Sequence, residues 1–550
     1  MIFSNLKGTT TRMSKPKIAV FSGQTATISN SPTLVTGNKG RLPGERPLPG
    51  RFEHLIAQEL YEPVVVKIKK FSGHPLEIDA KEVYHDNGKD YWEVELHPND
   101  GPYLLPYVAR RANDSTHGTP FEESDLLNSD INYGGRQFFY PDAKRIFIDI
   151  DRTISGRDHN GEANILNNQA DFEFIRVLPP GGYTKQGEVH GKDFFGYKPF
   201  PIRKLAPPGS LAKVINMVQS AFDNGTFTGG IWLEGTPSLE ETLYWLNLLL
   251  DSDIPLAGVS SQRPHGQISN DGDHNIIDAV GYVLSGQGSD LGVVAVLDER
   301  IFASRELKKG DDRPGGYKAT GGHGGVLGSP GPPITIWYKP AFRHTKRSDV
   351  NLSNLPKVLE FTDITTEQEQ IRIPIKDDNG FLLEESIPKV DIVKFGHYWS
   401  NDSIEGWDAI SDANADCEVG ILARIQQGLE EQSNNNTTSP KLHGFVLEGA
   451  NPYGFGSGTQ MAALAIAACS GMPVVIVGRS DLEGPTPPYW HELTILGSNL
   501  DSNKARILLM ATLLKLGRLP KARNPRNPTA IEKQAIESRI QEFQKIFDTH

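Results

Sequence analysis

The sequence of 550 residues contains only two cysteines, Cys417 and Cys469, which excludes a disulfide framework and a four-cysteine zinc site. It has no apolar run near the roughly 18 residues that a membrane-spanning helix needs. Residues 1–17 also lack the apolar stretch of a secretory signal. We therefore expect a cytoplasmic protein that does not associate with a membrane.

Basic residues are outnumbered, with 56 Lys and Arg against 68 Asp and Glu and a net charge of −12. Binding to nucleic acid needs clustered Lys and Arg for the phosphates, so we expect no nucleic-acid partner. There is no phosphate-binding GxxxxGK[ST] run. His491-Glu492 begins like a zinc-protease motif but has no second His, so we expect neither a metal nor a cofactor.

The length predicts three or four folding units, and 37% hydrophobic residues are enough for sizeable cores. Short apolar segments at Gly230–Leu233, Pro255–Val259 and Leu291–Leu297 alternate with helical patterns. Such an alternation is typical of a parallel sheet covered by helices on both faces. The sequence therefore predicts the α/β class.

Changes in the pattern of strand-like and helix-like segments along the chain predict its domain boundaries. We assign 17–51 and 197–345 to an N-terminal α/β domain, 52–196 to an inserted, mostly β unit, 346–384 to a connector, and 385–550 to a second, smaller α/β domain.

Three places near the ends of predicted strands carry side chains capable of chemistry. They are Thr25, the turn Glu234–Ser238 and Lys309. Open α/β sheets bind ligands at the carboxyl ends of their strands. Each place also has an ordinary interpretation: a loop threonine, a helix cap built either by Ser238 with Glu241 or by Thr236 before Pro237, and a solvated lysine.

The order of these motifs resembles the bacterial-type L-asparaginase/glutaminase family. The similar segments are 17–25 (KIAVFSGQT), 230–242 (GIWLEGTPSLEET), 258–264 (GVSSQRP), 270–280, 291–309 and 497–514. Each segment is degenerate on its own, and the resemblance depends on their shared order and spacing.

This resemblance implies a doubly wound N-terminal domain, a flavodoxin-like C-terminal domain and a homo-oligomer, either a dimer or a tetramer. It also implies an amidohydrolase that acts on the C–N bond of linear amides through a threonine acyl-enzyme. Thr25 falls at the nucleophile position, and Thr236 and Lys309 fall at the supporting positions. Gly23, Glu234 and Gly235 would line the substrate site.

The sequence departs from the family pattern at three points. Pro237 stands where the family has an aspartate that binds the α-ammonium group of the substrate, Glu234 replaces a histidine, and 26–45 contains no tyrosine. We therefore expect ammonia release from a side-chain or other primary amide, with a substrate altered from L-asparagine. The alternative is a non-catalytic homologue that binds a small metabolite or a protein partner.

Overall fold

The computed structural model describes two main α/β units. The described residues are 15–23, 146–147, 150–151, 165–177, 208–263, 269–320, 322–362, 370–396, 417–433, 442–450, 454–479 and 492–550, together with short strands elsewhere. Thr25 and the segment 26–32 lie outside these residues.

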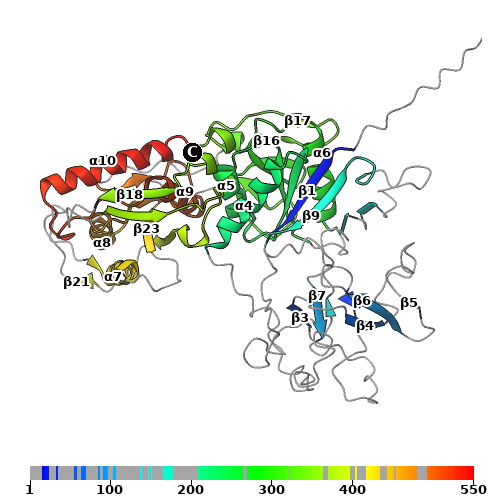
Figure 1. The fold of residues 1–550 in the computed structure, drawn as a ribbon, viewed down its shortest axis with the longest axis horizontal. Helices are drawn as coiled ribbons and strands as arrows, with labels where there is room; N and C mark the ends of the chain where they lie inside the picture. Colours follow the sequence, from blue (N-terminus) through cyan, green and yellow to red (C-terminus); the bar gives the residue numbers. More distant parts are fainter. Residues whose placement is uncertain are drawn as a thin grey trace, which may run out of the picture.

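The first unit is built on a sheet of eight strands. Its order is β17 (Thr335–Ile336), β16 (Val326–Ser329), β13 (Arg300–Ala303), β12 (Val293–Leu297), β11 (Leu256–Val259), β10 (Gly229–Leu233), β1 (Lys17–Ser22) and β9 (Asp171–Arg176). The five strands from β12 to β9 are parallel, whereas β13, β16 and β17 are antiparallel to their neighbours. Figure 1 shows this sheet with helices packed around it.

Alternate residues of β1 face two different cores. Ala19 and Phe21 join the core that contains α4 (Ser210–Asp223) and α5 (Leu239–Leu249). Ile18 and Val20 join the core that contains α6 (Gly272–Leu284). Since successive side chains of a strand point to opposite faces, a strand buried on both sides must be apolar throughout. The prediction of the α/β class is confirmed.

Strand β9 differs from the predicted organisation. It lies within 52–196, which the sequence analysis assigns to the inserted unit, yet it pairs in parallel with β1 from Lys17↔Asp171 to Ser22↔Arg176. Part of that range therefore belongs to the first sheet. In the same range, β8 (Gln137–Phe138) pairs antiparallel with β2 (Thr33–Leu34), and two further groups of short antiparallel strands lie wholly within the range. They are β3 (Leu55–Gln58) with β7 (Tyr103–Pro106), and β4 (Val64–Lys69) with β6 (Tyr91–Leu96) and β5 (His85–Asp86). The domain boundaries stay predictions.

The second unit has a parallel sheet in the order β20 (Lys389–Lys394), β23 (Leu442–Gly449), β24 (Val474–Gly478) and β25 (Ile495–Leu496). Its helices are α7 (Val419–Ser433), α8 (Gly458–Cys469), α9 (Ser502–Leu516) and α10 (Ala530–Phe547). Capping boxes at Ser457 and Thr529 begin α8 and α10, which explains where these helices start. In Figure 1, α10 runs in red along this unit.

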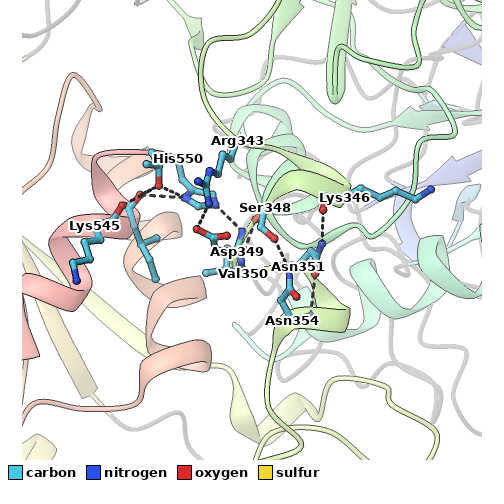
Figure 2. Close-up of polar contacts among 11 residues, drawn as sticks. Arg343, Lys346, Ser348, Asp349, Val350, Asn351, Asn354, Lys545 and His550 are labelled. Atoms are coloured by element: carbon cyan, nitrogen blue, oxygen red, sulfur yellow. Dashed lines mark hydrogen bonds and ion pairs between the residues drawn. The ribbon is translucent and has the colours of Figure 1, made fainter.

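The two units are joined through a polar junction. Figure 2 shows the segment after Arg343 meeting the residues that follow α10. The backbone N–H of Asp349 donates to Nε2 of His550 at 2.9 Å, and Arg343 pairs with the Asp349 carboxylate at 2.6 Å. Helix α9 also packs against α5, so the second unit contacts the helix that begins at the candidate site.

Candidate active site

The candidate site lies at the carboxyl edge of the first sheet. Ser22, at the end of β1, is in register with Leu233 at the end of β10, and the backbone N–H of Gly23 donates to the carbonyl of Leu233 at 2.9 Å. The chain leaves β10 through Glu234–Ser238 and enters α5 at Leu239. Parallel pairing therefore places Gly23, two residues before Thr25 in the sequence, beside the turn that contains Thr236.

Lys309 reaches this edge by a different route. Asp298 and Glu299 both have positive φ and form the tight turn between β12 and the antiparallel β13. After a further turn, the chain continues into β14 (Leu307–Lys309). The Nζ of Lys309 donates to Oγ1 of Thr236 at 2.7 Å. The structure thus brings together two residues that are 73 positions apart in the sequence.

Glu234 is buried, with 2% of its surface exposed. Its two carboxyl oxygens accept hydrogen bonds from Nε1 of Trp232 at 2.9 Å and from the hydroxyl of Ser238 at 3.0 Å. Burial raises the pKa of Glu234 to about 7, although these hydrogen bonds oppose the change. The carboxyl group of Glu234, at the end of β10, therefore titrates near neutral pH.

The predicted capping box at the start of α5 is not formed. Ser238 is the N-cap residue, but its side chain makes no capping hydrogen bond and donates to Glu234 instead. The sequence pattern gave no sign of this contact, because a serine followed three residues later by a glutamate is the usual signature of a capping box.

Gly23 lies against the same side chains. A Cβ atom at this position would lie 2.8 Å from Cζ2 of Trp232 and 3.2 Å from Cδ of Glu234. The absence of a side chain at residue 23 therefore lets the end of β1 approach Glu234 closely. Gly235 is partly exposed and accepts a hydrogen bond from the backbone N–H of Ser238 at 3.3 Å. Pro237 is exposed.

Two further residues, one in contact with Lys309 and one in contact with Glu240, carry no signal in the sequence. Glu240, in the first turn of α5, accepts the backbone N–H of Lys309 at 3.0 Å. Lys504, on α9, is buried and donates to the backbone carbonyl of Glu240 at 2.7 Å. Lys504 lies 264 positions from Glu240, so no local pattern could have linked them.

Within the described ranges, no group of three His, Cys, Asp or Glu side chains is placed to hold a metal ion. Among the helices of that same part of the chain, none combines the length and apolar character needed to cross a bilayer.

The arrangement around Thr236 offers a hydroxyl, an amine and backbone groups, which is a set suited to proton transfer.

Residues 206–313, which contain Thr236 and Lys309, match the asparaginase family in the part described as "Asparaginase, N-terminal". This part of the chain is asparaginase-like in sequence. The match covers β10 to β14 and therefore the contact between Thr236 and Lys309, whereas Gly23 and Lys504 lie outside this asparaginase-type region.

Relatives of this asparaginase-type region include a glutaminase-asparaginase from Acinetobacter glutaminasificans, which is 30% identical over 148 residues. That alignment covers 26% of this chain and 43% of the relative. L-asparaginase 2 from Bacillus subtilis (strain 168) is 33% identical over 149 residues, covering 27% of this chain and 38% of the relative. The chain thus spans less than half the length of the curated relatives it matches.

Among solved structures, the chain is similar to a probable cytoplasmic L-asparaginase from Campylobacter jejuni. The TM-score is 0.45 at 19% sequence identity, and the alignment covers 69% of this chain and 87% of that structure.

Proposed function

We propose that this protein is an asparaginase-like amidohydrolase that releases ammonia from a side-chain or other primary amide. The contact between Lys309 Nζ and Thr236 Oγ1, at 2.7 Å, is the observation that carries the proposal. It lies at the carboxyl edge of a parallel sheet, beside the strand that leads to Thr25. The match of residues 206–313 to the asparaginase family supports the same class of reaction.

In the proposed reaction, the hydroxyl oxygen of Thr25 forms a bond to the amide carbonyl carbon. The proton of that hydroxyl passes to the Thr236–Lys309 pair and then to the leaving nitrogen. The C–N bond breaks and ammonia leaves, so that an ester to Thr25 remains. Water then attacks the ester carbonyl, releases the carboxylic acid and restores the Thr25 hydroxyl.

Pro237 suggests how the substrate differs from L-asparagine. Its side chain cannot bind an α-ammonium group, and it follows directly after Thr236. Each carboxyl oxygen of Glu234 already accepts a hydrogen bond, one from Trp232 and the other from Ser238. We infer that the substrate is an amide that does not present an α-ammonium group to this turn.

The test compares ammonia release from L-asparagine and succinamic acid, which differ only in the α-amino group, and from L-glutamine and propionamide. We expect succinamic acid to match or exceed L-asparagine in kcat/KM, and Pro237→Asp to move the preference toward L-asparagine. Replacing Thr25 by Ala should lower kcat by about 10³-fold or more. Thr335→Ala is the matched control, because Thr335 is exposed on β17.

The loss of the family aspartate at Pro237 also supports the alternative function, a non-catalytic homologue that binds a small metabolite or protein. Equal ammonia release by the wild type and Thr25→Ala would remove Thr25 from the mechanism. No Thr25-dependent release from any amide of the panel would favour the binding protein. Homo-oligomerisation stays a prediction for either function.

A further inference from the structure

The position of Lys309 raises the question of what holds its amine at Thr236. Lys309 ends a strand of three residues, β14, whose one partner among the described strands is β15 (Tyr317–Ala319). This two-stranded ribbon is separate from the eight-stranded sheet that fixes the turn containing Thr236. The hydrogen bonds of the main sheet therefore do not set the distance between the two residues.

Glu240 supplies a direct link between them. Its Oε2 atom accepts the backbone N–H of Lys309 at 3.0 Å, and Glu240 itself lies four residues after Thr236. The carboxylate thus ties the backbone of Lys309 to the first turn of the helix that follows Thr236. A hydrogen bond to an ionised acceptor is stronger than one between neutral groups, so this link restrains the lysine backbone.

Lys504 anchors Glu240 from the second unit. Its Nζ donates to the backbone carbonyl of Glu240 at 2.7 Å and also to the carbonyl of Ser304, which precedes β14. One buried ammonium therefore contacts both segments that Glu240 connects. Burial raises the pKa of Glu240, but the charge of Lys504 and the N–H of Lys309 oppose this and favour the carboxylate.

We propose that Glu240 is a positioning residue, which holds the Lys309 amine on Thr236 by binding the Lys309 backbone. This inference rests on the proposed function of the Thr236–Lys309 pair. Glu240 does not act on the substrate itself. Its contribution to the reaction passes entirely through Lys309.

The variants Glu240→Ala and Glu240→Gln test the proposal. Alanine removes the acceptor, whereas the glutamine carbonyl can still accept the Lys309 N–H. We expect Glu240→Ala to lower kcat by about 10²-fold with little change in KM, because misplacing a reacting group by about 1 Å costs that much. Glu240→Gln should recover most of the lost kcat. The matched control is Glu241→Ala, because Glu241 is the next residue of α5 and pairs with Arg506.

A double-mutant comparison separates positioning from a general loss of stability. If Glu240 acts through Lys309, adding Glu240→Ala to Lys309→Ala causes no further loss of kcat. A residue that only stabilises the fold would lower kcat further in that background. Such an additive loss, or equal loss in Glu240→Ala and Glu240→Gln, overturns the proposal.

A crystal structure of Glu240→Ala keeps this test independent of the proposed reaction. Loss of the 2.7 Å contact between Lys309 Nζ and Thr236 Oγ1 supports positioning, and its retention overturns it. If the wild type shows no Thr25-dependent ammonia release, the proposed function is contradicted. The crystal structure of Glu240→Ala still shows whether Glu240 holds Lys309 on Thr236.

Discussion

The buried carboxyl of Glu234 makes the stability of the protein depend on pH in a way that one substitution should remove. Glu234 is 2% exposed, and burial raises its pKa from 4.5 to about 7. Between these values the folded protein holds a proton that the unfolded chain has released. The contribution of this proton to the free energy of unfolding is fully present below about pH 4.5. It is lost as the pH rises to about 7.

The size of the effect follows from the two pKa values. Each pH unit in this window changes the free energy of unfolding by about 1.4 kcal/mol, so the loss is about 3 kcal/mol in total. Glu234→Gln removes the titrating group and keeps its shape. The glutamine carbonyl can accept the Trp232 N–H, and its amide can donate to the Ser238 hydroxyl.

The assay is urea unfolding of the wild type and Glu234→Gln from about pH 4.5 to about pH 8, followed by tryptophan fluorescence. We expect the variant to gain about 3 kcal/mol relative to the wild type across this range, because other titrating groups are common to both proteins. Glu385→Gln, at an exposed glutamate that is not among the groups acting on Glu234, is the control and should show no such trend. A constant difference between wild type and Glu234→Gln at every pH would refute the reasoning.

Two other substitutions test the packing around the site. Gly258→Ala places a Cβ 2.3 Å from Cδ1 of the buried Leu243, and we expect the free energy of unfolding to fall by about 1–3 kcal/mol in urea titrations. Lys504→Ala leaves the backbone carbonyls of Glu240 and Ser304 without this donor, and we expect a loss of about 1–3 kcal/mol by the same measurement. Wild-type unfolding midpoints in either variant would contradict these expectations.

The sequence predicted the parts of the fold that have a local pattern. The apolar segments at Gly230–Leu233 and Pro255–Val259 form β10 and β11, because a strand buried on both faces is apolar throughout. Strand β9 has polar residues between its apolar ones, and its partner β1 lies far away in the sequence. Nothing local distinguishes it from strands of the inserted unit, so the sequence pattern alone places it in that unit.

The candidate site was predictable to a similar degree. Thr236 and Lys309 were singled out by the resemblance to a family, and the structure places them in contact, while their roles stay predictions. Glu240 carried no signal of its own, because a glutamate in the first turn of a helix is ordinary. Its importance depends on a backbone N–H 69 positions away, which only the folded chain can reveal.

Strand β1 pairs in parallel with both β9 and β10, so the connections that follow β1 and β9 begin at the same edge of the sheet. Gly23, after β1, donates its N–H to the end of β10 that leads to Thr236, and Val177, after β9, donates its N–H to Ser22 at the end of β1. Residues inserted after Gly23 or after Val177 leave the hydrogen bonds between the strands intact. Evolution can therefore lengthen or exchange these two stretches to suit a new compound while the residues beneath them keep their places.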